Sequence, residues 1–432
     1  MNIRDGILSN AARTAVLAQL KQVKTHISQG RWLGTRNLSY RNEYAFRRAS
    51  HQEGAEFIST SSILHLYDGW CYLGNALRAL VKNEPFVVGH LAYYAELRAA
   101  MSLLASMGMV NIDKEIFCID KLMHIRRVPS LGYDIKGTHQ IVWKLLEEAV
   151  SIRNQPAEFL KLHKIFRIGG LTLEDWVVGM SGGESGMSIV SEYVKKWGVD
   201  IQNYDSDRKI RNKLSYDIST FQGVTRNDYD GVIELLQDFW SCFEPVGAEN
   251  FSIDFYLLWL IMQNVRKVKG WDEETYKLKL IAFLQTTALS EADQTRYVNI
   301  LTRTARSFSA LLKLGRSFSV GSGKYYLHII SRATILLRIA TVACGDAFQK
   351  AGLHASDVEW WINTFAEEKG LWKSRPENYS DLYEDVKEAL EDLQSRTVHN
   401  YSDFLTHNCG NEINPFPTLG FSEYVMLWGL PS

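Results

Sequence analysis

The sequence predicts an all-α protein. Apolar residues recur at three- and four-residue steps, for example at Leu91, Tyr94, Leu97, Met101 and Leu104, and this spacing places them on one face of a helix. The 432 residues include only 8 Pro, beside 12 Trp and 20 Tyr. Few prolines and many large aromatic residues favour long helices that pack through ring contacts. The 46% of apolar residues is enough to bury a sizeable core.

The periodicity also locates the individual helices. Each expected helix has apolar positions at helical spacing and ends near a Gly, a Pro or a cluster of turn residues. The expected helices span residues 11–26, 69–80, 90–107, 138–152, 173–178, 206–216, 229–243, 255–268, 273–285, 291–314, 325–350, 356–369, 380–396 and 424–428. A short strand is expected at 116–119, inside a stretch made irregular by Pro and Gly.

A chain of this length predicts two or three domains. Residues 1–60 are expected to form a basic helix and arm, and residues 61–243 a helical domain with an irregular insertion. Residues 250–432 are expected to form a second multi-helix domain with an irregular tail. The boundary is placed near 244–247, where a helix ends and turn residues cluster.

Several functional classes lack support in the sequence. The five Cys are scattered without a CxxC pair, which predicts reduced thiols in a cytoplasmic protein and neither a zinc site nor another cofactor site. The 11 His contain no HExxH or HxH pair. The longest uninterrupted apolar run, at 255–262, is far shorter than the roughly 20 residues of a membrane span. We therefore expect no metal, no cofactor and no membrane segment.

One stretch is depleted of acidic residues. The 52 residues between Asp293 and Asp346 contain neither Asp nor Glu, although about six are expected from 49 in 432. Cations interleaved with aromatic rings are typical of single-stranded nucleic-acid binding. The candidate nucleic-acid-binding residues are Arg303, Arg306, Lys313, Arg316 and Lys324. The alternative is that these cations pair with acidic residues elsewhere, such as those of segment 377–392.

Three short motifs resemble the HEPN superfamily of helical domains. They are Gly-Trp-Cys-Tyr-Leu-Gly at 69–74, His-Leu-Ala-Tyr-Tyr-Ala-Glu-Leu-Arg-Ala-Ala at 90–100 and Arg-Asn-Lys-Leu-Ser-Tyr at 211–216. The resemblance covers roughly residues 60–220. It implies an up-and-down helix bundle of a kind found in metal-independent ribonucleases and toxins of bacterial defence systems, often with a dimeric active site.

The resemblance also implies site residues. The family motif is an Arg, usually followed by a polar residue, with a His four to six residues further on. Arg211 and Asn212 match it, while Tyr216 stands at the His position. In this interpretation Arg211 contacts the scissile phosphate, Asn212 and Glu96 orient it, and Tyr216 or Ser215 completes the site. A phenol with an ordinary pKa near 10 is a poor proton-transfer group at neutral pH, so any ribonuclease activity is expected to be weak.

Two functions remain open at this point. The first is a cytoplasmic component of a bacterial defence or toxin-like system that engages RNA or another single-stranded nucleic acid, with or without enzymatic activity. The second is a non-catalytic adaptor whose HEPN-like helices assemble with a partner protein or as a homodimer. Loss of the motif His with retention of Arg211 is compatible with both.

Overall fold

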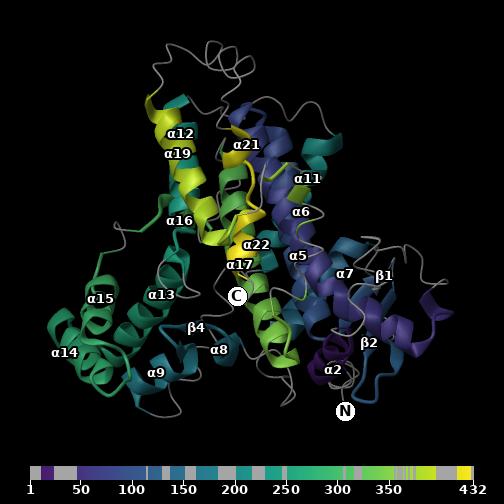
Figure 1. Cartoon of the computed structure of the whole chain (residues 1–432), viewed down its shortest axis with the longest axis horizontal. Helices are drawn as coiled ribbons and strands as arrows, with labels where there is room; N and C mark the ends of the chain where they lie inside the picture. The colour runs from purple at the N-terminus through teal and green to yellow at the C-terminus, as the bar shows by residue number, and fades with distance from the viewer. Residues whose placement is uncertain are drawn as a thin grey trace.

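The computed structural model is predominantly α-helical, as the periodicity predicts (Figure 1). Two small antiparallel sheets accompany the helices in the described part of the chain. The structure describes residues 11–23, 46–112, 115–128, 137–150, 162–182, 201–216, 229–245, 251–304, 308–315, 324–354, 357, 363, 366–367, 370–372, 376–395 and 416–429.

Three long helices form the centre of the molecule: α5 (His51–Val81), α6 (Pro85–Ser106) and α17 (Tyr325–Ala351) (Figure 1). Pro85 occupies the first turn of α6, where its missing N–H has no intrahelical partner to lose. Gly352 ends α17 in the left-handed conformation, with φ of 69°, which residues with a Cβ rarely adopt.

Helix α5 begins 18 residues before the expected helix at 69–80. Ser50 and Glu53 form a capping box at its start. The polar run Ser59-Thr60-Ser61-Ser62 interrupts the apolar periodicity, yet it is buried inside the helix. The hydroxyls of Thr60, Ser61 and Ser62 donate to backbone carbonyls of the preceding turn, for example Ser61 to Phe57 at 2.6 Å, which satisfies their polarity without water. The Ser59 hydroxyl has no hydrogen-bond partner among the described residues.

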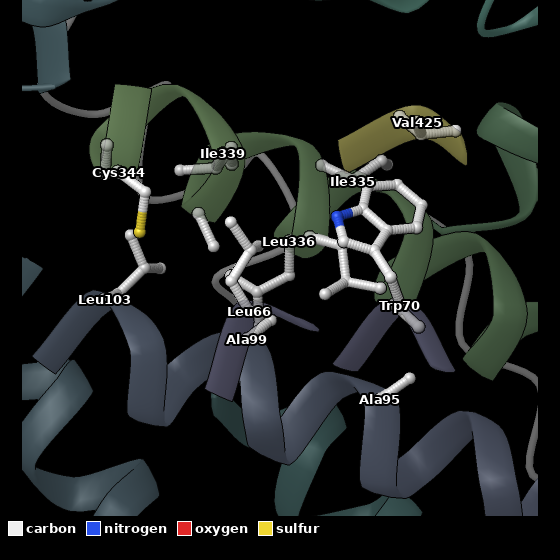
Figure 2. Packing of buried hydrophobic residues seen from close by; sticks show 14 of the residues in the cluster. Leu66, Trp70, Ala95, Ala99, Leu103, Ile335, Leu336, Ile339, Cys344 and Val425 are labelled. Atoms are coloured by element: carbon white, nitrogen blue, oxygen red, sulfur yellow. The ribbon is translucent and has the colours of Figure 1, made fainter. Parts of the chain in front are cut away.

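Helix α17 belongs to the segment expected as a second domain, yet it packs against α5 and α6. The indole Nε1 of Trp70 donates to Oγ1 of Thr341 at 3.1 Å. Figure 2 shows Trp70 and Leu66 of α5 beside Leu336 of α17. Buried residues from both 61–243 and 250–432 belong to one hydrophobic cluster.

The strand expected at 116–119 is confirmed as part of a three-stranded sheet. β1 (Met109–Ile112), β2 (Glu115–Ile119) and β3 (Ile125–Val128) pair in the order β1-β2-β3, and Met109 lies opposite Cys118. A second, two-stranded sheet joins β4 (Arg167–Ile168) to β5 (Leu171–Thr172).

Shorter helices surround the central three. On one side, α7 (Thr138–Val150) and α11 (Ile201–Tyr216) pack against α6 (Figure 1). The remaining helices are α2 (Arg13–Val23), α8 (Leu162–Ile165), α9 (Leu173–Ser181), α12 (Tyr229–Ser241), α13 (Ser252–Lys269), α14 (Glu273–Leu284), α15 (Glu291–Leu301), α16 (Ala310–Leu314), α19 (Leu382–Ser395), α21 (Phe416–Leu419) and α22 (Tyr424–Gly429), with the 3₁₀ helix η5 (Tyr379–Asp381) before α19.

The single helix expected at 291–314 is in fact two. Helix α15 ends at Leu301, and Ser309 begins α16 by accepting a hydrogen bond from the backbone N–H of Leu312 at 3.2 Å. Apolar periodicity continues across the interruption, which explains the prediction, but a serine cap marks a new helix start.

Among the described helices, α17 alone is long and apolar enough to span a membrane. Of its most apolar window, 94% is buried inside the protein. Burial of this kind is expected for the core helix of a soluble protein, because a membrane-spanning helix exposes apolar side chains to lipid.

Candidate functional site

The predicted residues Arg211 and Asn212 lie together on α11, where this helix packs against α6 and α7. The Arg211 Nη1 donates to Oδ1 of Asn212 at 2.8 Å, and its Nη2 donates to the phenol oxygen of Tyr94. The guanidinium carbon lies 4.9 Å from the ring centroid of Tyr94 and 5.7 Å from that of Tyr93. These distances allow cation–π attraction to both rings.

A cluster of aromatic and imidazole rings lies beside Arg211. The Tyr93 phenol oxygen lies 2.9 Å from Nδ1 of His139 and accepts from Nε1 of Trp143 at 3.4 Å. The ring of His90 lies 5.0 Å from that of Tyr94. His90, Tyr93 and Tyr94 come from α6, whereas His139 comes from the first turn of α7.

Both histidines at this site are neutral at pH 7. Burial, together with the positive charges of Arg211, Arg208 and Arg98, lowers the pKa of His139 to about 4. Burial and Arg211 also lower the pKa of His90. A neutral imidazole keeps one nitrogen lone pair and can therefore accept a proton.

The charge of Arg211 is not neutralised by an acid. No carboxylate in the described part of the chain forms an ion pair with it, and its buried Nε atom has no hydrogen-bond partner there. Arg208 lies one turn earlier on the same face of α11. A half-buried cation without an acidic partner, surrounded by neutral groups, favours the binding of an anion.

Glu96, expected to orient the phosphate with Arg211, lies in a different cluster. It is fully buried, with Oε1 3.5 Å from Nε of Arg332 on α17. Arg332 also donates from Nε to Asp207 at 2.9 Å and from Nη2 to both oxygens of that carboxylate. Burial and the nearby charge of Asp207 raise the pKa of Glu96 well above its ordinary value, so this carboxyl is a structural group of the core.

Tyr216 ends α11, and its side chain and that of Ser215 lie outside the described residues. The sequence motif therefore places the phenol on the same helix as Arg211. The structure supplies two imidazoles near Arg211 instead, from other helices.

The cations between Asp293 and Asp346 differ in how far they are buried. Arg332 pairs with Asp207, and Arg338 pairs with Asp254 at 2.8 Å with the ring of Phe251 4.5 Å away. Both arginines are almost completely buried. Internal pairing thus holds for these two, although their partners lie in α11 and α13 rather than in segment 377–392.

The predicted nucleic-acid-binding residues are placed differently from one another. Arg303 and Lys324 are exposed and Lys313 is half-buried. Arg306 and Arg316 lie outside the described residues. Arg303 follows α15, whereas Lys313 lies on α16 and Lys324 precedes α17.

Sequence reasoning assigned no role to His90, Tyr93, Tyr94 or His139. His90 and Tyr94 are four residues apart on a helix, which places them on one face and is a usable signal. Nothing in the sequence connects them with His139, because that contact depends on the packing of α7 against α6.

No group of three or more potential metal-ligating side chains occurs among the described residues. His399, His407 and Cys409, which are loosely spaced in the sequence, lie outside those residues. Comparisons with protein-family models, with curated proteins and with solved structures found no match to this chain.

Proposed function

We propose that this protein is a cytoplasmic, HEPN-like component of a bacterial defence or toxin-like system, and that it binds RNA at Arg211 and cleaves it weakly without a metal ion. One observation carries the proposal. The Arg211 guanidinium has no acidic partner in the described structure and lies beside two histidines that are neutral at pH 7.

The groups at this site match the chemistry of an RNA chain. A guanidinium recognises a phosphate through parallel hydrogen bonds, and Arg208 adds a second positive charge nearby. The rings of Tyr72 and Tyr94 stack with centroids 5.3 Å apart. Aromatic side chains of this kind stack on unpaired bases regardless of sequence.

The cleavage step uses His139 as the base. In the tautomer that donates from Nδ1 to Tyr93, the Nε2 lone pair of His139 accepts the proton of the ribose 2′-hydroxyl. The 2′-oxygen then bonds to phosphorus and the bond from phosphorus to the 5′-oxygen breaks. The imidazolium returns its proton to the 5′-oxygen, which gives a 2′,3′-cyclic phosphate and a 5′-hydroxyl end.

The low pKa of His139 makes this reaction slow. A pKa of about 4 makes His139 a weak base, since general bases are most effective when their pKa lies near the working pH. A bound phosphate partly offsets Arg211 and raises that pKa, so the base improves only once RNA is in place.

A non-catalytic adaptor is the second candidate. Tyr216 replaces the motif His, and Arg211 already bonds to Asn212 and Tyr94 within the protein. Both features suit an arginine that shapes a surface for a partner protein or a second copy of this chain. With that function, the Arg211 site binds the partner and cleaves no RNA.

The test is RNA cleavage in the presence of EDTA, with products separated on a denaturing gel. Arg211→Ala and His139→Asn are expected to abolish cleavage, since Asn keeps a bond to Tyr93 without a base. Lys209→Ala, which removes an exposed charge from the same helix, is the matched control and retains activity. Loss of cleavage in Tyr216→Phe would instead make that phenol the proton-transfer group.

The adaptor function predicts a different outcome. The wild-type protein then shows no cleavage, and a partner protein that co-purifies with it is lost from Arg211→Ala but kept by Lys209→Ala. Cleavage that persists in a folded Arg211→Ala variant contradicts the site assignment altogether.

A further inference from the structure

A cleft of about 830 Å³ lies away from the Arg211 site. It is bounded by the end of α12, the first half of α13, helix α15 and the start of α16. Helices α15 and α11 lie on opposite sides of the central helices (Figure 1). A volume of this size is typical of small-molecule sites, so the cleft is a separate candidate site.

One wall of the cleft is positively charged. Arg296 and Arg303 both line it, and Asn299 lies between them. Neither arginine forms an ion pair with a carboxylate in the described part of the chain. Glu244 is the acidic residue among the lining residues, so the two arginines leave the cleft with an excess of one positive charge.

Aromatic residues also line the cleft. They are Phe255, Tyr256 and Phe308, and the ring of Phe308 lies 5.4 Å from that of Tyr256. The guanidinium of Arg296 lies 5.3 Å from the ring centroid of Phe255. Charge and aromatic surface are therefore adjacent within one cleft.

Hydrogen bonds between side chains and the backbone hold the lining residues in position. The indole Nε1 of Trp259 donates to the carbonyl oxygen of Arg303 at 3.0 Å and packs on Phe308 with ring centroids 5.1 Å apart. The N–H of Leu311 at the start of α16 donates to Asp238 of α12 at 2.5 Å. A site preorganised in this way loses little conformational entropy when a ligand binds.

We propose that this cleft binds a nucleotide, whose phosphate contacts Arg296 and Arg303 and whose base lies against Phe308. Two guanidinium groups that lack a carboxylate partner among the described residues, together with a half-buried aromatic ring, match a ligand that carries a phosphate and a flat ring. The nucleotide is either a free mononucleotide or the phosphorylated end of an RNA chain. This proposal is independent of the Arg211 site.

Isothermal titration calorimetry with the full-length protein tests it. The probes are the four 5′-mononucleotides, the matching nucleosides, inorganic phosphate, and a tetranucleotide RNA with or without a 5′-phosphate. A mononucleotide is expected to bind more tightly than its nucleoside and than inorganic phosphate, because each of those fragments lacks one half of the interaction. Binding of the 5′-phosphorylated RNA without binding of mononucleotides assigns the site to an RNA end.

Variants separate the cleft from general charge effects. The double variant Arg296→Ala/Arg303→Ala is expected to bind the nucleotide at least about tenfold more weakly, and Phe308→Ala is expected to weaken it as well. Lys277→Ala/Lys279→Ala removes the same charge from exposed positions of α14 and leaves the affinity unchanged, as does Arg211→Ala.

Three results would overturn the proposal. They are no heat of binding for any nucleotide or phosphorylated RNA, equal affinity for inorganic phosphate and nucleotides, and equal affinity in wild type and the Arg296/Arg303 double variant. Because Arg211→Ala is tested beside them, a failure here is distinct from a failure of the proposed RNA site.

Discussion

The carboxylate of Asp207 and the guanidinium of Arg332 form a buried, bidentate ion pair that joins α11 to the central helix α17. Arg332 donates from Nε at 2.9 Å and from Nη2 at 2.6 Å, and both side chains are about 1% exposed. Asp207 lies one turn before Arg211 on the same helix. The pair therefore fixes the helix that carries the candidate site.

Breaking this pair is expected to destabilise the protein strongly. Arg332→Met or Asp207→Ala leaves an uncompensated buried charge, which typically costs about 3–5 kcal/mol. The double variant is expected to lose less than the sum of the two single changes, because it leaves neither charge alone. Urea unfolding followed by circular dichroism measures both values.

The surface pair Lys387–Glu384 serves as the control for that experiment. It spans one helical turn of α19 with both side chains well exposed. Removing it is expected to change the free energy of unfolding by less than about 0.5 kcal/mol. A loss of similar size in the buried and exposed pairs would contradict the structural role of Asp207 and Arg332.

Glu96 predicts a pH dependence of stability. Its pKa in the folded protein lies above the ordinary value of 4.5, because of burial and the charge of Asp207. Its contribution to stability is thus complete below about pH 4.5 and is lost as the pH rises through the folded pKa. The Glu96→Gln variant cannot ionise at this position. The urea midpoint of the variant is therefore expected to rise relative to that of wild type as the pH rises. Parallel curves for the two proteins would refute this.

The pKa of His139 reports how close its imidazole lies to the Arg211 guanidinium. Its folded pKa of about 4 lies below the ordinary 6.5, so the imidazole stays neutral across pH 5–8 and its stabilising contribution is lost as the pH falls through 4. Removing the Arg211 charge in Arg211→Met is expected to raise this pKa, with burial keeping it below 6.5. Titration of labelled histidines by NMR tests both statements; an unchanged pKa would place Arg211 too far away to act on His139.

The shared core predicts how the protein responds to a cut between its two halves. A specific protease site inserted at 246–250 is expected to yield two fragments that still elute together in size-exclusion chromatography. The reason is that α17 remains packed against α5 and α6. Separation of the fragments without denaturant would show that the halves fold independently. Limited proteolysis is expected to cut first near residues 245–250, because turn-rich segments open more readily than packed helices.

Local sequence patterns predicted much of the fold but little of the candidate site. Periodicity predicted α6 and α17 with ends within a few residues of those in the structure, because amphipathic spacing and terminal Gly or Pro are local signals. The absence of acids between Asp293 and Asp346 was a sound observation, yet it partly reflects a buried helix. Arg332 and Arg338 take their carboxylates from other helices.

The candidate site depends on contacts that no local pattern encodes. Arg211 and Asn212 were found through one short motif, but Glu96, from the motif at 90–100, lies in the core beside Arg332 instead. His139 meets Tyr93 across 46 positions of sequence. Such pairings follow from how α7 and α11 pack on α6, so they emerge only once the tertiary structure is known.

RNA binding at Arg211 is tested most directly by the affinity of the protein for a fluorescently labelled single-stranded RNA, measured by anisotropy at low and moderate salt. Wild type and Lys209→Ala are expected to bind alike, and Arg211→Ala, with an unchanged circular dichroism spectrum, is expected to bind about tenfold to a hundredfold more weakly. The salt dependence is expected to become less steep in Arg211→Ala, since one phosphate contact is lost. Equal RNA affinity in Arg211→Ala and wild type would contradict the assignment of this site to RNA.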